Sequence, residues 1–247
     1  MNRTAFRARF ATTGPVVLPV IHVLDARQTL ENIGLALGEG APGVFLINHD
    51  FGIDAFLPII AKARAAHPRA WIGINFLAVT GRDAFPVLGR LAREGVPIDA
   101  YWADDARIDE RAADQTEATE IAAARERSGW HGVYFGGTAF KKQRPVAAAD
   151  WQHSALLARD WMDVVTTSGV ATGEAAEGAK IAAFRQGLGD RPLAIASGIT
   201  PENAGAYRAA DCFMVATGIN REGDFYNIDP ARLRALLAIA AGLHEEA

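Results

Sequence analysis

The sequence contains a single cysteine, Cys212, so it can form neither an internal disulfide bond nor a cysteine-based zinc site. Long apolar runs are also missing, because none approaches the roughly 20 residues that a membrane-spanning helix needs. The first residues include Arg3, Arg7 and Arg9, but no apolar segment of a secretory signal follows them. These absences lead us to expect a soluble, cytoplasmic protein with no membrane span.

Positive charge is not in excess either. The chain has 29 acidic residues against 25 lysines and arginines, which gives a net charge of -4. A nucleic-acid-binding protein would instead show a basic stripe, so we expect no nucleic-acid partner. Half of the residues are hydrophobic, which is typical of a folded globular protein.

Eight short apolar runs alternate with longer segments of helical period. Continuous apolar runs are typical of parallel strands that are covered on both faces. The expected strands are Val16–Leu24, Gly43–Asn48, Trp71–Leu77, Ala100–Ala103, Gly132–Gly136, Asp163–Thr167, Leu193–Ser197 and Cys212–Ala216. Eight such units and 247 residues predict one (β/α)8 TIM barrel over residues 1–247, with residues 1–15 as an N-terminal arm. An open doubly wound sheet is the alternative, and the absence of a Gly-x-Gly-x-x-Gly turn after the first strand counts against its dinucleotide-binding version.

Several helix starts can be located by their capping residues. Asp25 and Gln28 resemble a capping box, in which each end of the motif satisfies a free backbone amide. Thr200-Pro201 and Asp229-Pro230 each place a capping side chain before a proline at the first helical position. We therefore expect helices to begin at these three places.

Polar side chains gather at the expected carboxyl ends of the strands, where TIM barrels hold their active sites. His22 and His49 are candidate acids or bases because imidazole titrates near neutrality, although a buried structural role is the alternative for His22. Asn48 and Asn75 could orient substrate hydroxyl groups. The opposite strand ends carry no comparable set, so the sequence predicts a functional mouth.

Three carboxylates follow these strands. We place Asp50 ahead of Asp104 as the group that transfers a proton, and the alternative is that Asp50 only caps the next helix. Adjacent residues on a strand point apart, so at most one of Asp104 and Asp105 should face the barrel axis. These carboxylates could hold Mg²⁺, whereas no residue spacing indicates a zinc site and no other cofactor is implied.

The last three units end in a repeated pattern of a small hydroxyl residue and glycine, in SGVATGEAA, IASGITPEN and VATGI. Glycine lets a backbone amide approach an anion, and the loops after strands seven and eight are the recurrent phosphate site of this fold. Ser197, Gly198, Thr217 and Gly218 are therefore candidate phosphate ligands, with a short helix over 219–222 adding its positive N-terminus. The alternative is that these glycines only permit tight turns.

The segment GGTAFKKQRP follows the fifth strand and holds Lys141, Lys142 and Arg144. Such a cluster could attract an anionic substrate and close over it. We expect the loop 138–145 to be mobile without a ligand, and a solvated surface loop is the alternative.

Six motifs occur in the order seen in the BtpA/SgcQ family: PVIHV, APGVFLINHDF, VYFGGTAFKKQ, VVTTSGVATGEAA, SGITPENAGAY and GDFYNIDPARL. The chain resembles this family from about Val16 to Leu237. The resemblance implies a TIM barrel related to the ribulose-phosphate-binding barrels. It also implies a phosphate grip at Ser197, Gly198, Thr217 and Gly218, with Ser168, Gly169, Thr172 and Gly173 nearby. Some members are linked to photosystem I biogenesis and others to carbohydrate operons, and similar chains are labelled phosphoribosyltransferases.

Two functions remain open from the sequence. The first is an enzyme acting on a small phosphorylated sugar or a phosphoribosyl or nucleotide-like molecule, by isomerase, lyase, or glycosyl or phosphoribosyl transferase chemistry. The second is a non-catalytic ligand-binding or assembly factor of the kind the resemblance implies. The polar strand ends favour the enzyme. Because barrels often associate through their helices, we also expect a homodimer.

Overall fold

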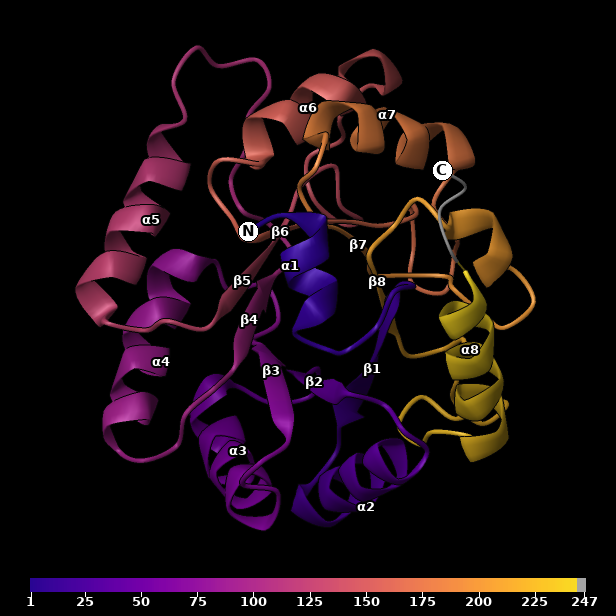
Figure 1. Ribbon diagram of the computed structural model, residues 1–247. Coiled ribbons are helices and arrows are strands. Elements are labelled where there is room, and N and C mark those ends of the chain that lie inside the picture. The colour runs from indigo at the N-terminus through magenta and orange to yellow at the C-terminus, as the bar shows by residue number, and fades with distance from the viewer. Residues whose placement is uncertain (244–247) are drawn as a thin grey trace.

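The computed structural model describes residues 1–243 and shows a closed barrel of eight parallel strands (Figure 1). Neighbouring strands follow the chain order, and β8 closes the barrel by pairing with β1. The strands are β1 (Val16–Val23), β2 (Gly43–Asn48), β3 (Trp71–Asn75), β4 (Ala100–Ala103), β5 (Val133–Gly137), β6 (Val164–Thr167), β7 (Leu193–Ile195) and β8 (Cys212–Val215). The (β/α)8 TIM barrel predicted from the apolar runs is confirmed.

Helices surround the barrel on the outside (Figure 1). They are α2 (Ala26–Gly38), α3 (Ile53–Ala66), α4 (Gly81–Arg93), α5 (Thr116–Ser128), the 3₁₀ helix η1 (Ala148–Asp150), α6 (Trp151–Ala158), α7 (Gly178–Leu188) and α8 (Pro230–Gly242). Two expected starts are confirmed: the Asp25 carboxylate accepts from the Gln28 amide at 2.8 Å, and Asp229 accepts from the amide of Ala231 at 2.8 Å. Among residues 1–243, no helix has the length and apolar character needed to cross a membrane.

Two helices expected in the C-terminal quarter of the chain, one beginning at Thr200-Pro201 and a short one over 219–222, are not formed. After β7 the chain makes only the 3₁₀ helix η2 (Ala204–Tyr207), because the Asn203 side chain accepts from the Thr200 amide and donates to the Gly198 carbonyl, which closes a tight turn. The helix predicted over 219–222 is also wrong. Asn220 there pairs with Ile228 in an antiparallel bridge, so the segment folds back on itself.

The first helix, α1 (Arg3–Ala8), lies across the N-terminal end of the barrel, in front of the strands in Figure 1. Its Phe6 is completely buried in the cluster that fills the barrel interior. The Phe6 ring meets the ring of Phe135 from β5 edge-on, with 6.0 Å between centroids. Helix α1 therefore closes the barrel at this end and leaves the carboxyl ends of the strands as the open mouth.

A repeated ion pair ties the helices to the barrel at the same end. In each case an aspartate stands directly before an even-numbered strand. It accepts a hydrogen bond from a backbone amide of the odd-numbered strand before it, and it pairs with an arginine of the helix that leads into that odd-numbered strand. The pairs are Arg64–Asp99 at 2.5 Å, Arg125–Asp163 at 2.6 Å and Arg185–Asp211 at 3.0 Å, and the amides are those of Ile72, Tyr134 and Leu193. The N-terminal face is therefore built for stability, as is usual in this fold.

Asp211 differs from the other two aspartates in its burial and in its partners. Its side chain is completely buried, and it also pairs with Arg3 at 2.9 Å and Arg7 at 2.8 Å, both from α1. A buried carboxylate is stable only when it is paired and hydrogen-bonded. Asp211 thus joins α1, α7, β7 and β8 in one network.

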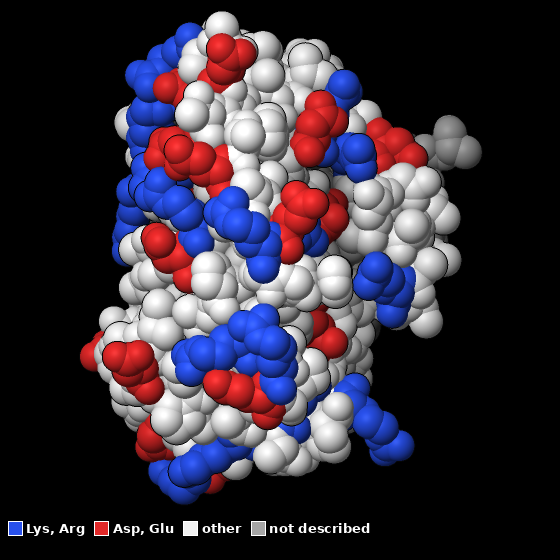
Figure 2. Space-filling view, turned by 90° about the vertical axis from the view of Figure 1, so that its left-hand side faces the viewer, with Lys and Arg blue, Asp and Glu red and all other residues white. Residues whose placement is uncertain are grey.

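The outer face formed by α4 and α5 carries charges of both signs side by side (Figure 2). An exposed ion pair between Arg82 and Glu120 at 3.1 Å links the two helices. Exposed pairs of this kind contribute little to stability, about 0–1 kcal/mol.

We predict that Asp211→Asn lowers the free energy of unfolding by about 3 kcal/mol, because it leaves three partly buried arginines without their counter-charge. Urea denaturation at neutral pH measures the change. Asp99→Asn is the matched control, since it stands at the same place in the repeat but has a side chain that is 37% exposed, and it should lose less. Equal stability of the two variants would show that burial of Asp211 carries no special weight.

Candidate functional site

Five titratable or amide side chains meet at the mouth of the barrel, opposite α1. They come from successive units: His22 on β1, His49 after β2, Asn75 at the end of β3, Asp104 after β4 and Lys141 in the loop after β5. The electrostatic interactions of Lys141 reach His22, His49 and Asp104, so these groups share one region. The structure therefore brings together part of the set expected from the strand ends.

Asp104 is the inner carboxylate of the mouth. Its Oδ1 accepts a hydrogen bond of 3.0 Å from Nδ2 of Asn75, which is completely buried. Burial raises the pKa of Asp104, while the hydrogen bond from Asn75 and the charge of Lys141 oppose that rise. The neighbouring Asp105 instead accepts a hydrogen bond of 2.7 Å from the backbone amide of Arg107, in the same loop. Asp104 can thus hold or release a proton closer to neutrality than an ordinary aspartate.

Lys141 folds into the mouth and does not extend into solvent. Its Nζ donates to the carbonyl of Ala196, at the end of β7, over 3.1 Å. Its backbone amide donates to Oγ of the buried Ser168 over 2.7 Å. Burial lowers the pKa of Lys141, and the nearby Asp104 carboxylate works in the opposite direction. The side chain is therefore an oriented amine with a reduced preference for its charged form.

The two histidines form an edge-on ring pair with 4.6 Å between centroids. Burial, followed by the charge of His49, lowers the pKa of His22 to about 4, so His22 is neutral at physiological pH. Its Nδ1 lies 2.9 Å from the Phe225 carbonyl, and because a carbonyl oxygen only accepts, Nδ1 carries the proton. Nε2 is then the free acceptor. Burial also lowers the pKa of His49.

Asn48 and Asp50 lie in different surroundings. Asn48 donates to the Phe51 carbonyl at 2.5 Å and accepts from the Leu77 amide at 3.1 Å, so it holds two loops together. Asp50 is exposed at the rim and accepts from the Tyr226 hydroxyl at 2.7 Å. It does not cap α3, whose N-cap is Gly52 without a side-chain bond. Of the two candidate carboxylates, Asp104 occupies the inner position and Asp50 the outer one.

The glycines of the expected phosphate motif allow loops six, seven and eight to pack closely. Gly198 has a φ of +66°, and a Cβ there would lie 2.1 Å from the Ala175 nitrogen. A Cβ on Gly218 would lie 1.9 Å from the Ile199 carbonyl oxygen. The tight-turn explanation therefore accounts for these two glycines, whatever else their amides do. A substitution at Gly198 would disturb loop packing and could not isolate an effect on a ligand.

Ser168, Gly169 and Ser197 also hold these loops together. The Gly169 amide donates to Oγ of Ser197 over 2.8 Å, and Oγ of Ser168 donates to the Gly169 carbonyl over 2.9 Å. All three residues are buried. Their hydroxyl groups are thus engaged within the protein.

An open groove of about 720 Å³ lies between the ends of β7 and β8 and the first turn of α8. Arg232 crosses its wall and donates from Nε to the Gly218 carbonyl over 3.0 Å, while Arg221 is exposed beside it. The described residues provide no hydrogen-bond acceptor for the amides of Thr217 and Gly218. Thr172 is exposed on loop six but is not in the lining. The lining residues are Gly173, Thr200, Thr217, Gly218, Asn220, Arg221, Glu222, Gly223, Asp224, Phe225 and Arg232.

The loop after β5 is tied down at several points. Arg144 forms a two-pronged ion pair with Glu110 at 2.6 and 2.8 Å, so it joins loop five to loop four. Lys180 of α7 is buried beneath the loop and donates to the carbonyls of Ala139 and Ser168. Lys142 remains exposed. These tethers favour an ordered loop over the mobile lid that the sequence predicts.

Lys180 was not singled out from the sequence, because its helical segment places it far from any strand end. Burial lowers its pKa to about 8, and its ammonium lies over the rings of Trp151 and Phe184 at 5.8 and 6.0 Å. In the sequence, only its position after the small residues Gly178 and Ala179 could have indicated that Lys180 packs closely against other loops. Its role is to hold the backbone of loops five and six.

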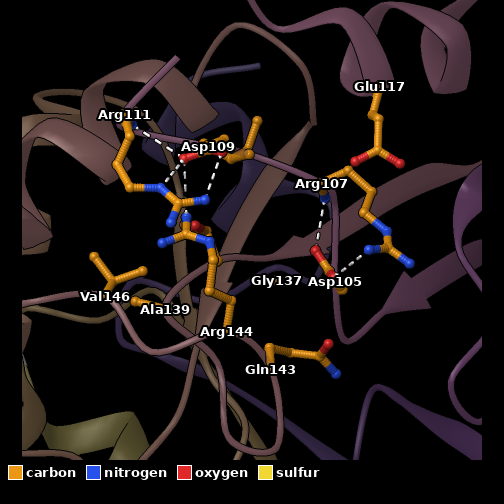
Figure 3. A pocket seen from close by; sticks show the side chains of 12 residues that line it. Asp105, Arg107, Asp109, Arg111, Glu117, Gly137, Ala139, Gln143, Arg144 and Val146 are labelled. Atoms are coloured by element: carbon orange, nitrogen blue, oxygen red, sulfur yellow. Dashed lines mark hydrogen bonds and ion pairs between the residues drawn. The ribbon is translucent and has the colours of Figure 1, made fainter.

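A second, smaller pocket of about 190 Å³ lies between loops four and five (Figure 3). In Figure 3, Arg111 points at Asp109 and Arg107 points at Asp105, and these pairs measure 2.8 and 3.5 Å. Arg144 enters the same group from loop five. Because each of these arginines already faces a carboxylate, the pocket offers little uncompensated charge to a ligand, and we assign it to loop joining.

The carboxylates of the mouth do not converge on one point. Within residues 1–243, no three His, Cys, Asp or Glu side chains are grouped so that they could hold a metal ion. Asp50, Asp104 and Asp105 point to the rim, the centre and the loop pocket, respectively. The protein side chains therefore give no support to the Mg²⁺ site considered from the sequence.

Comparison with known proteins gives similarity in structure only. No model of a known family matches the chain, and no curated protein matches it in sequence. Phosphoribosylanthranilate isomerase from Thermotoga maritima aligns with a TM-score of 0.64 and 14% identity, over 93% of this chain and 100% of that one. The enzyme of that name from Thermus thermophilus gives 0.58 and 18%, over 92% and 99%. The 2-keto-3-deoxy-6-phospho-gluconate aldolase from Zymomonas mobilis gives 0.63 and 15%, over 98% of both chains. At these identities the similarity shows the barrel fold, and BtpA/SgcQ membership stays a prediction.

Proposed function

We propose that the protein is an enzyme that acts on a small phosphorylated sugar or similar molecule. The phosphate binds in the groove between the ends of β7 and β8, and the reacting carbons lie over Asp104 and Lys141. One observation carries the proposal: the groove adjoins the cluster of titratable groups, because Phe225 lines the groove and its carbonyl accepts from Nδ1 of His22 at 2.9 Å.

The groove has the features that an anion needs. The amides of Thr217 and Gly218 are free to donate, and the guanidinium groups of Arg221 and Arg232 supply positive charge. Part of the charge of Arg232 is offset by Glu202 at 3.1 Å, whereas Arg221 is exposed in the groove and interacts with the Asp224 carboxylate there. The structurally similar isomerases and aldolase carry phosphorylated substrates in their names, which is consistent with this use of the fold.

The titratable groups support chemistry in addition to binding. Burial disfavours the charged forms of His22, Asp104 and Lys141, and this lowers the stability of the folded chain. A non-catalytic assembly factor has no need for such groups in its mouth, whereas an enzyme uses shifted pKa values for proton transfer. Asp104 is the proton donor and acceptor in this proposal, and the free Nε2 of His22 accepts a hydrogen bond from a substrate hydroxyl group.

The groove leads to a direct binding test. Arg221→Gln should weaken the binding of inorganic phosphate about fivefold, because an exposed ionic contact contributes about 1 kcal/mol. Isothermal titration calorimetry at low salt measures the affinity. Arg234→Gln is the matched control, since Arg234 is an exposed arginine of α8 that pairs with Glu39 away from the groove. If both variants bind phosphate like the unmodified protein, the anion site lies elsewhere.

Burial of His22 has a consequence for stability in acid. The folded chain binds the His22 proton only near pH 4, whereas the unfolded chain binds it near 6.5, so the protein loses stability as the pH falls from 6.5 towards 4. The loss attributable to this group is about 3 kcal/mol.

His22→Gln should remove that part of the pH dependence, and urea denaturation at pH 7 and pH 4.5 measures it. The exposed His131 provides the control variant His131→Gln, which should keep the full acid dependence. A His22→Gln protein that loses as much stability in acid as the control would show that His22 is protonated in the folded state.

A further inference from the structure

We propose that Lys141 is a nucleophile that forms an imine with the carbonyl carbon of the substrate. The inference rests on the proposed function and makes it more specific: the substrate is a phosphorylated aldehyde or ketone, and the reaction is of the lyase or isomerase class that proceeds through an iminium ion.

Lysine is rare in this chain, and its placement is informative. Of the 25 lysines and arginines, only Lys62, Lys141, Lys142 and Lys180 are lysines. Arginine stays protonated in proteins and cannot attack a carbonyl group, whereas a lysine can lose its proton and do so. Three of the four lysines lie in or against the loop after β5. Lysine is therefore concentrated around this loop, whereas arginine supplies the other basic side chains of the protein except Lys62.

Only one of these amines is placed to react. Lys62 and Lys142 have exposed side chains, and no hydrogen bond among the described residues orients either amine. Lys180 is held beneath the loop by two backbone carbonyls, those of Ala139 and Ser168. Lys141 alone extends across the mouth from β5 to the end of β7.

The backbone of the loop is shaped to hold Lys141 in this place. Ala139 and Lys142 have φ values of 45° and 60°, a left-handed conformation that non-glycine residues adopt only where the surroundings impose it. Between them, Phe140 is buried in the barrel interior, with its ring 6.0 Å from that of Trp102. The amide of Lys141 is bound to Ser168. This arrangement keeps the amine oriented before any substrate arrives.

An acid is placed for the same reaction. Burial lowers the pKa of Lys141, which increases its neutral fraction, and burial raises the pKa of Asp104, which increases its protonated fraction. Lys141 and Asp104 interact electrostatically with each other. The other charged or titratable groups that interact with one or both of them are Lys142, Asp105, His22 and His49. The mouth thus holds together an amine and a carboxyl group whose charged forms are both disfavoured by burial, as imine formation requires.

The step balances without a further reagent. The neutral Nζ of Lys141 forms a bond to the carbonyl carbon, and one of its protons moves to the carbonyl oxygen, which gives a carbinolamine. The Asp104 carboxylic acid then protonates that hydroxyl group, the C–O bond breaks and water leaves. The nitrogen lone pair forms the C=N bond, so an iminium ion and the Asp104 carboxylate remain. The carboxylate can next take a proton from the carbon beside the iminium.

Reductive trapping tests the inference on the full chain. The protein is incubated at neutral pH with dihydroxyacetone phosphate or glyceraldehyde 3-phosphate and sodium cyanoborohydride, which reduces an iminium ion to a stable amine. Mass spectrometry of the intact chain and of its peptides locates the adduct. We expect one adduct per chain on Lys141, formed faster than on Lys62 or Lys142, because the Lys141 amine is held in place and burial lowers its pKa. Lys141→Arg should abolish it, and the matched control Lys142→Arg should retain it.

The outcomes separate this inference from the proposed function. No adduct on Lys141 with either probe, or labelling spread evenly over the lysines of the unmodified protein, overturns the imine. That readout does not depend on whether the Lys141→Arg variant folds. Phosphate binding and its sensitivity to Arg221→Gln would be unaffected by this result. Conversely, an adduct on Lys141 that inorganic phosphate does not slow, and that unphosphorylated dihydroxyacetone forms equally fast, supports the imine and contradicts the phosphate groove.

Discussion

The end of the barrel at which the strands begin depends on the ion pairs and the hydrogen bond of the buried Asp211 carboxylate. This carboxylate accepts from the Leu193 amide and pairs with arginines of α1 and α7, so one side chain fixes two helices and two strands. Asp99 and Asp163 repeat the arrangement at two other places around the barrel. Because this end is closed by α1 and tied by ion pairs, the opposite end is free to use its residues for other purposes.

At the mouth, the buried titratable groups reduce the stability of the fold. His22, Asp104 and Lys141 are held where burial disfavours their charged forms, and Asn75 supplies the hydrogen bond that keeps Asp104 in place. Such groups are tolerated because the rest of the barrel supplies the stability that they reduce. This division of the fold into a stabilising face and a face with unfavourable electrostatics is typical of TIM-barrel enzymes.

Loops five to eight form one packed unit that positions both parts of the proposed site. Lys180 binds the backbone of loops five and six, and Gly198 lets loop six lie directly on loop seven. Lys141 then connects loop five to the end of β7. A change in any of these loops would therefore be felt at the amine and at the groove together, which explains why small residues and buried hydroxyl groups are concentrated there.

The sequence by itself determined the eight strands, most helix starts and the polar mouth, since apolar runs, capping residues and strand ends are local patterns. It also indicated Lys141 and the hydroxyl-glycine motifs. Only the tertiary structure showed that Asp104 is more buried than Asp50, because both follow a strand and their burial depends on distant neighbours. It also revealed the role of Lys180 and the turn that replaces the helix after β7. The network around Asp211 was hidden for the same reason: Arg3 and Asp211 are 208 positions apart in the chain, and only barrel closure brings them together.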